Sequence, residues 1–352
     1  MNITQAKFML DTVIKKSRVH FYKPFQIAEI LRHARLEGPI DLSDVETYRN
    51  TSRRWRDDVS RLLVGRCCNS SARYQDDLFN ATACPPEALV VLGECNIRLH
   101  GVVEAYIYSR FGAKVSAVGD MLSQIEKATP GTFDLQKFME SFEASPGLKR
   151  SMDKIFEISV YALVSTVVRA LRVEVSVSVL NSDPLLMRAF EDFLGKVVGL
   201  PKGARSVKLP ASVFRLGATN AADRGLDMVA NFGLAIQVKH LTLDADAIAD
   251  ICESVTAPRI VIVCKDSEIE VIGALVQQLG LTDRLQAVVT LSDLCQWYEV
   301  CMRPHNSATL GVQLLADFAR EFMEEFPSMG GLNEFMRHRV YTAASLPNEW
   351  AL

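Results

Sequence analysis

The sequence predicts an α/β protein, a mixed sheet flanked by helices, preceded by a mainly helical N-terminal region. Before residue 146, apolar residues recur at helical spacing, and Pro or Gly turns separate the segments. From residue 148 onward, helical segments alternate with short runs rich in β-branched residues, in the order α-β-α-β-β-α-β-α-β. The turn at Ser145-Pro146-Gly147 marks the change, so we expect two regions, 1–146 and 147–352.

Four segments of the first region have helical signals. Ile3–Ser17 has apolar residues at helical spacing, and a second helix starts at Pro24, whose fixed backbone angle suits a first turn. Capping residues over Asp41–Asp44 precede a third helix at roughly 45–63, and helical spacing resumes over Val102–Phe111. These segments predict a helical N-terminal region.

The second region opens with a long apolar helix over Lys149–Leu171. Its uncharged run of eleven residues, Ile158–Val168, is too short to span a bilayer. The alternating, β-branched run Val173–Leu180 then predicts a strand. The elements expected after it are a helix at 183–198, two strands within 215–243, a helix over Asp244–Ser254, a strand over Arg259–Cys264, a helix at 267–279, a strand over Gln286–Thr290, and helices over Asp293–Met302 and Thr309–Phe326.

Composition and motifs exclude several classes of protein. A hydrophobic content of 49% and a charged content of 23% are ordinary for a folded soluble chain. The N-terminus has no signal-peptide core, so we expect a cytoplasmic protein without a membrane partner. None of the eight cysteines has CxxC spacing, which argues against zinc and for reduced thiols. Phosphate-binding and dinucleotide-binding glycine loops and the GxSxG elbow are absent from the sequence.

The strongest functional signal lies in residues 215–243, which predict a hairpin with a tight Asn231-Phe232-Gly233 turn. A three-residue loop pairs residues whose numbers sum to 464, so Asp227 on the first strand faces Gln237 on the second. Side chains alternate along a strand, which places Lys239 on the same face as Gln237. A carboxylate, an amide oxygen and an ammonium group therefore meet on one face of the hairpin.

This combination suits metal-dependent hydrolysis of a phosphodiester. Mg²⁺ prefers oxygen ligands, which Asp227 and the neutral carbonyl of Gln237 supply. Lys239 would hold the attacking hydroxide and stabilise the transition state electrostatically. The alternative is an ordinary polar hairpin face, because an isolated Asp-x9-Gln-x-Lys pattern arises often by chance.

The neutral Gln237 leaves a metal ion short of negative charge, and Glu157 is the candidate to supply it. Glu157 lies in the apolar helix, where an unpaired carboxylate would be costly. The alternative for this residue is a local ion pair with Lys154 at i−3, and Asp223 is a second option for the additional ligand.

A basic cluster predicts the surface that contacts DNA. Residues 1–73 contain 14 Lys and Arg against 8 Asp and Glu, and seven of these arginines fall within 49–73. Such side chains grip phosphates or read guanine edges, and an Asn can read adenine or simply cap a turn. An ion pair between Arg53 and Asp57 is the alternative for one of them. The predicted DNA-binding residues are Arg49, Asn50, Arg53, Arg54, Arg56 and Arg73.

The chain resembles type II restriction endonucleases of the HaeII type over nearly its whole length. The resemblance is carried by YKPFQIAEIL, ETYRNTSRRWRD, SSARYQDDLF, GVVEAYIY, PGLKRSMDKIFEISVYAL, TNAADRGLDMVANFGLAIQVKHL and TAPRIVIVCK. It implies Mg²⁺-dependent double-strand cleavage of DNA at the palindrome RGCGCY. A palindromic target in turn implies a homodimer. A cognate DNA methyltransferase would protect host DNA without having to bind this chain.

The hairpin also resembles the PD-(D/E)xK nuclease motif, with Asp227 in the place of its Asp and Lys239 in the place of its Lys. Leu226 replaces the Pro, and Gln237 replaces the second acid. Glu157 matches the helix glutamate that many members of that fold carry before their first strand. The resemblance makes 147–352 a PD-(D/E)xK-like nuclease domain and 1–146 a helical, basic DNA-contacting region.

Two other functions stay open at this point. One is a sequence-specific DNA-binding regulator with an inactive nuclease-like domain, which the neutral Gln237 keeps open. The other is a structure-specific nuclease that acts on junctions or damaged ends.

Overall fold

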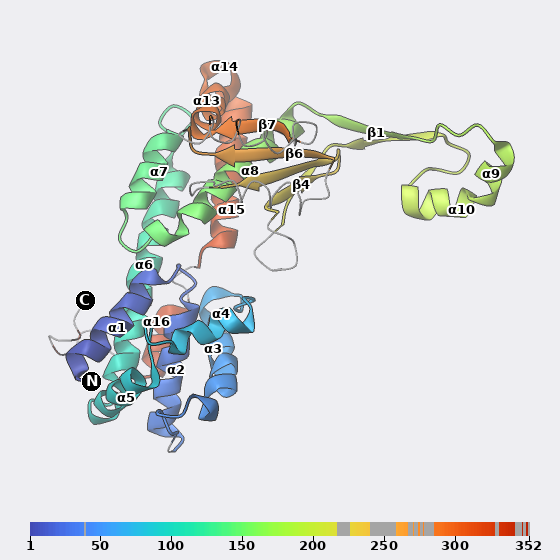
Figure 1. Cartoon of the computed structure of the whole chain (residues 1–352). Helices are drawn as coiled ribbons and strands as arrows, with labels where there is room; N and C mark the ends of the chain where they lie inside the picture. Colours follow the sequence, from blue (N-terminus) through green and yellow to red (C-terminus); the bar gives the residue numbers. More distant parts are fainter. Residues whose placement is uncertain are drawn as a thin grey trace. The chain divides into compact units, whose positions relative to one another are not determined.

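The N-terminal part of the chain is helical, as predicted, and both sheets are built from residues after 170 in this computed structural model (Figure 1). The structure describes residues 1–38, 40–216, 226–239, 258–266, 270, 274, 277, 285–327, 331–341, 347 and 350. The chain forms two compact units. The first contains Met1–Ile158 and Leu315–Leu352, and the second contains Ser159–Gly217 and Asp223–Leu314.

Helices make up the described part of the first unit. Helix α1 begins with a capping box, in which Asn2 and Gln5 bond reciprocally to each other's backbone. The helical elements are α1 (Ile3–Lys16), α2 (Tyr22–Leu36), η1 (Val45–Thr47), α3 (Arg49–Val64), α4 (Ala72–Asp76), η2 (Asp77–Phe79), α5 (Pro86–Arg98), α6 (Val102–Lys127), α7 (Leu135–Ala144), η3 (Lys149–Ser151), α8 (Met152–Ala170), α15 (Val312–Glu325) and α16 (Leu332–His338). Two of them, α8 and α15, continue into the second unit.

Two buried carboxylates join α2, α6 and the C-terminal residues of the first unit. Glu29 accepts hydrogen bonds from Arg339 and, at 2.5 Å, from Tyr108. Glu104 accepts two from Arg35, at 2.8 and 2.9 Å. Ionised groups are tolerated in a core only when hydrogen bonds replace their lost hydration. These contacts therefore favour one arrangement of the helices.

The second unit contains the mixed sheet, which confirms the predicted fold class. Its strands are β3 (Val213–Arg215), β4 (Met228–Ala230), β5 (Leu234–Val238), β6 (Arg259–Cys264) and β7 (Leu285–Thr290), in that spatial order. The first two pairings are antiparallel and the last two are parallel. Strand β6 is buried along nearly its whole length, as expected for a parallel strand between two neighbours.

Helices follow the sheet much as the sequence predicts. They are α13 (Leu291–Met302), α14 (Pro304–Asn306) and η6 (Ser307–Gly311), which leads into α15. The helix predicted over Asp244–Ser254 lies outside the described residues, as does most of the helix predicted at 267–279.

The strand predicted over Val173–Leu180 exists as β1 (Glu174–Ser178). We expected this strand in the mixed sheet, and that expectation is wrong. It pairs antiparallel with β2 (Ser206–Pro210) in a separate two-stranded sheet. The connection between them contains α9 (Pro184–Ala189), α10 (Glu191–Phe193) and η4 (Leu194–Val198). We call 174–210 the arm and 180–204 its tip (Figure 1). Most residues of β1 and β2 are exposed, so little burial links this ribbon to a core.

Among the described residues, no helix is both long and apolar enough to cross a membrane.

A buried lysine links α6 to the end of α1. The ammonium group of Lys114 donates to the backbone oxygens of Ile14 and Ser17, at 3.1 and 2.6 Å. Burial disfavours its charged form and, with the nearby Arg110, lowers the pKa of Lys114 from 10.5 to about 8.

This shift predicts a pH dependence of stability. Between pH 8 and 10.5 the unfolded chain holds a proton that folded Lys114 has released, so stability rises with pH in this window. Relative to Lys114→Met, the wild-type free energy of unfolding should increase by up to about 3 kcal/mol from pH 7.5 to 10.5. Denaturant unfolding measures the difference, with Lys127→Met on the exposed end of α6 as the control. A difference that does not change with pH would contradict the assignment.

Candidate active site and nucleic-acid interface

The hairpin that carries the candidate active site has the predicted register. Gly233 takes a φ of 80°, which suits glycine, and its N–H donates to the Ala230 oxygen at 3.1 Å. Ala230 pairs with Leu234, and the two pairs before it also sum to 464. Asp227 immediately precedes β4 rather than lying on it. The same register continued by one residue places it opposite Gln237.

Hydrogen bonds hold the Asp227 carboxylate against β5. The side-chain amide of Gln237 donates to Asp227 Oδ2 at 2.8 Å, and the Val238 backbone N–H donates to the same oxygen at 2.7 Å. Gln237 is buried, with 2% of its surface exposed. The backbone oxygen of Asp227 accepts from Leu216 N–H at 2.8 Å, which ties this residue to β3 as well. The structure therefore brings Asp227 and Gln237 together, as predicted.

Asp227 and Gln237 carry the kind of oxygen ligands that Mg²⁺ binds. Adjacent ligands in an octahedron with metal–oxygen distances of 2.0–2.1 Å lie roughly 2.9 Å apart, close to the 2.8 Å between the two head groups. A half-turn of the amide exchanges its nitrogen and oxygen positions and presents a carbonyl ligand. The described residues contain no group of three or more His, Cys, Asp or Glu able to hold a metal. Water and a substrate phosphate would complete this two-residue site.

Lys239 follows directly on the strand that carries Gln237. Its backbone N–H donates to the Val263 oxygen at 2.8 Å, so the β5–β6 pairing extends past the end of β5. Alternation along the strand places the Lys239 side chain on the Gln237 face, and the residue is partly exposed. A cation at this position suits a site that handles phosphate.

Glu157 has the local partner that the sequence offered as an alternative. It is buried, and its Oε2 accepts from the Lys154 ammonium at 2.6 Å. Glu157 belongs to the first unit and the hairpin to the second. Its role as a metal ligand stays a prediction, and Asp223 lies outside the described residues.

Three of the predicted DNA-binding arginines are engaged within the protein. Arg49 and Arg53 both pair with Asp76 at the end of α4. Arg56 is 2% exposed, and its guanidinium donates to Asp57 at 2.7 Å. The Arg53–Asp57 ion pair, the alternative to DNA binding for Arg53, does not form, because Asp57 pairs with the neighbouring Arg56 and Arg53 with Asp76. Arg56 also donates to Gln75 of α4 at 2.8 Å, so this face of α3 holds α4 in place.

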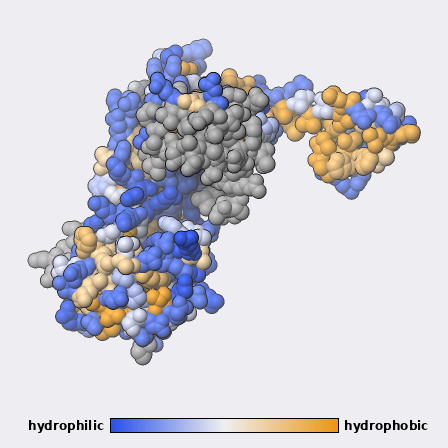
Figure 2. Space-filling model, in the orientation of Figure 1, coloured by the Kyte–Doolittle hydropathy of each residue, from blue (hydrophilic) through white to orange (hydrophobic). Residues whose placement is uncertain are grey.

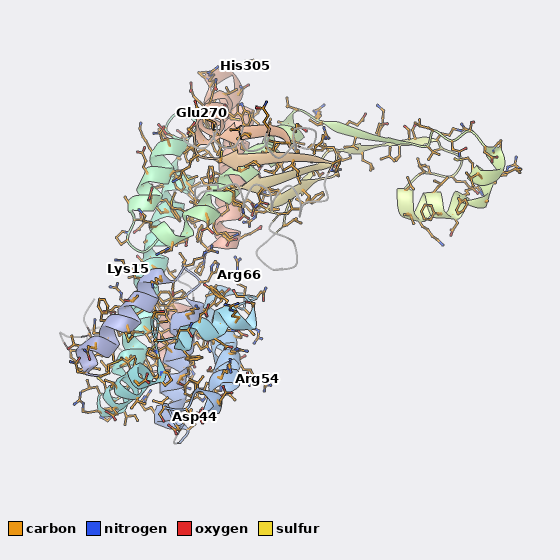
Figure 3. The ribbon with its side chains drawn as sticks, in the orientation of Figure 1. Lys15, Asp44, Arg54, Arg66, Glu270 and His305 are labelled. Atoms are coloured by element: carbon orange, nitrogen blue, oxygen red, sulfur yellow. The ribbon has the colours of Figure 1, made fainter. Side chains whose placement is uncertain are left out.

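The other predicted DNA-binding residues lie on the surface. Asn50 and Arg54 are exposed at i and i+4 of α3, and Arg54 projects from this helix (Figure 3). Arg73 is exposed on α4, the helix anchored by the α3 arginines. Gln75 and Asp76 are anchors that no sequence pattern predicted. The acidic and amide side chains of ARYQDD, so close in sequence to the arginines of α3, could have indicated that they bind those arginines.

The chain matches one protein family and two curated relatives over nearly its whole length. The family model described as HaeII restriction endonuclease matches residues 6–341. The chain is 47% identical over 332 residues to the "Type II restriction enzyme NgoBI" of Neisseria gonorrhoeae, covering 94% of each. It is 44% identical over 345 residues to the "Type II restriction enzyme HaeII" of Haemophilus aegyptius, covering 97% of this chain and 98% of the relative. No solved structure matches.

The Asp227–Gln237 contact predicts the behaviour of a Gln237→Glu variant. A second carboxylate would replace the amide donor beside Asp227, so stability without metal should fall by about 1–3 kcal/mol. Added Mg²⁺ should restore it and give a larger thermal shift than in the wild type, because the ion would then bind two carboxylates. Thermal unfolding with Mg²⁺ or with EDTA measures both effects, and Gln124→Glu at an exposed position of α6 is the control. Wild-type stability of Gln237→Glu in EDTA would contradict the contact.

Proposed function

We propose that this chain, which belongs to the HaeII restriction endonuclease family, makes Mg²⁺-dependent double-strand cuts in DNA at the palindrome RGCGCY. Membership makes it a type II restriction endonuclease, a site-specific deoxyribonuclease that acts on double-stranded DNA. The target RGCGCY is the finer part of the proposal. It is supported by 44% identity to the HaeII enzyme along nearly the full length of both chains.

The observation that carries the proposed chemistry is the Asp227–Gln237 pair. Asp227 would bind Mg²⁺ through its carboxylate and Gln237 through its carbonyl, with Glu157 as a further ligand or acting through water. When bound, Mg²⁺ lowers the pKa of a water and neutralises charge that develops on the phosphate. Lys239 would hold the attacking water in line and face the negative charge of the transition state. Burial of Gln237 keeps this ligand in place before DNA binds.

The predicted DNA-binding residues divide into two roles in this proposal. Asn50, Arg54 and Arg73 contact DNA directly, because they are exposed. Arg49, Arg53 and Arg56 act by fixing α4, and with it Arg73, against α3. A palindromic target suits a homodimer, and a cognate methyltransferase would protect host DNA.

One observation favours a second candidate function. Gln237 supplies no negative charge where PD-(D/E)xK nucleases carry an acid, so a DNA-binding regulator with an inactive nuclease-like domain is the alternative. A fixed pattern of cuts in linear duplex DNA distinguishes the two.

Digestion of a fully sequenced linear duplex tests the proposed activity and target together. With Mg²⁺, the purified protein should give discrete fragments whose ends all fall within RGCGCY, and EDTA should abolish cutting. Fragment ends at another sequence would overturn the target while keeping the endonuclease. Tight binding to one sequence without any cutting would favour the regulator.

Substitutions at the hairpin test the assigned residues. Asp227→Ala and Lys239→Ala should each lower the cleavage rate at least 100-fold and leave most of the DNA affinity, because each removes a group that acts on the reacting phosphate. Asp120→Ala and Lys137→Ala, at exposed positions of α6 and α7, are matched controls that should cut normally. Undiminished cleavage by either hairpin variant would exclude that residue from the chemistry.

The exposed arginines predict a change in the salt dependence of binding. Arg54→Ala and Arg73→Ala should each weaken DNA binding several-fold and reduce the slope of log K against log salt by roughly 1, since each would lose one phosphate contact. Titrations at several salt concentrations measure this, with Arg98→Ala on the exposed face of α5 as the control. A slope equal to that of the wild type would remove the residue from the interface.

A further inference from the structure

The tip of the arm exposes an unusual amount of apolar surface. Of residues 171–210, all of which the structure describes, only Leu200 is buried. Figure 2 shows the tip as a largely hydrophobic body at the end of the arm. The exposed apolar side chains of the tip are Leu180 at 92%, Leu185 at 77%, Leu186 at 42%, Phe190 at 52%, Phe193 at 51% and Val197 at 67%.

The arm does not contain enough buried surface to hold its own structure. Its helical pieces α9, α10 and η4 have six, three and five residues. Isolated helices below about 12–15 residues are marginal in water, and so is a single two-stranded ribbon. These elements are stable only if their apolar faces are covered, so the tip needs a partner.

The charges of the tip argue against DNA as that partner. Residues 180–204 contain three carboxylates and three cationic side chains, so the tip has no surplus of positive charge for phosphate. Lys196 already pairs with Asp192 at 3.0 Å, and Lys202 lies 3.8 Å from Glu191. A balanced, apolar surface fits a protein partner better than a polyanion.

The extent of the surface fits an interface between two copies of this chain. Taking about 150–200 Å² for a fully exposed side chain of this size, the six residues expose roughly 600–700 Å² in all. A standard interface buries about 800 Å² on each partner. In a two-fold contact the same patch covers itself, so no separate complementary surface is required.

We propose that the tip of the arm packs against the tip of a second copy and forms the homodimer contact. The choice of a second copy rests on the proposed function, because a palindromic site presents two half-sites related by a two-fold axis. The arm would then link two nuclease units that each act on one strand.

Two changes to the full-length chain test this contact. Phe190→Asp combined with Phe193→Asp places charge on the apolar face of both copies. The second variant replaces residues 180–204 with Asn-Gly, a dipeptide suited to a two-residue hairpin turn. Val179 and Arg205, the residues on either side of the replaced segment, are already joined by a backbone hydrogen bond of 2.9 Å. We therefore expect β1 and β2 to remain paired. Phe8→Asp, at a 72% exposed position of α1, is the matched control.

Sedimentation equilibrium without DNA or metal gives the mass of each protein in solution. We expect the wild type and Phe8→Asp to sediment at twice the chain mass of 39.1 kDa. Both tip variants should sediment at the mass of a single chain, which is below 39.1 kDa for the variant that lacks the tip. The tip substitutions should raise the dimer dissociation constant at least 100-fold. A monomeric wild type, or a dimeric chain without its tip, would overturn the proposal. Tip variants that stay dimeric, and that bind DNA more weakly in a separate titration, would also overturn it and assign the tip to DNA. Because this experiment involves no cleavage, failure of the wild type to cut at RGCGCY would refute the proposed function separately.

Discussion

The hydrogen bonds from β5 to the Asp227 carboxylate are the contact on which the proposed active site depends. They form only in one register of the hairpin, because a slip of one residue would turn Gln237 to the opposite face. The turn at Asn231-Phe232-Gly233 sets that register, and the parallel pairing of β5 with β6 holds it from the other side. Local turn geometry therefore determines which side chains can reach one metal ion.

The charged side chains of the first unit have a structural role in addition to the DNA binding that we propose for some of its arginines. Glu29 and Glu104 are buried and fully engaged, so their arginine partners join distant segments instead of reaching into solvent. Arg56 follows the same rule on α3, where its hydrogen bonds replace the water it lost. An arginine-rich helix can therefore be a scaffold on one face and a nucleic-acid surface on another.

Local patterns account for what the sequence predicted, and non-local pairing accounts for what it did not. The hairpin register follows from a three-residue loop, and the Lys154–Glu157 pair follows from helical spacing. By contrast, β2 has only five residues and pairs with a strand nearly thirty residues earlier, so its local sequence does not identify that partner. The partner of Arg49 and Arg53 is Asp76, on a different helix. Helical periodicity shows which arginines share a face, and it does not show what covers that face.

Affinity cleavage with Fe²⁺ shows whether a divalent metal binds at Asp227 and Gln237. Fe²⁺ with ascorbate produces radicals that cut the polypeptide close to the bound ion, and mass spectrometry locates the cuts. We predict cuts next to Asp227 and Gln237 in the wild type, suppressed by excess Mg²⁺ and lost in Asp227→Asn. Cuts confined to other segments, or an unchanged pattern in Asp227→Asn, would exclude a metal site at these two residues.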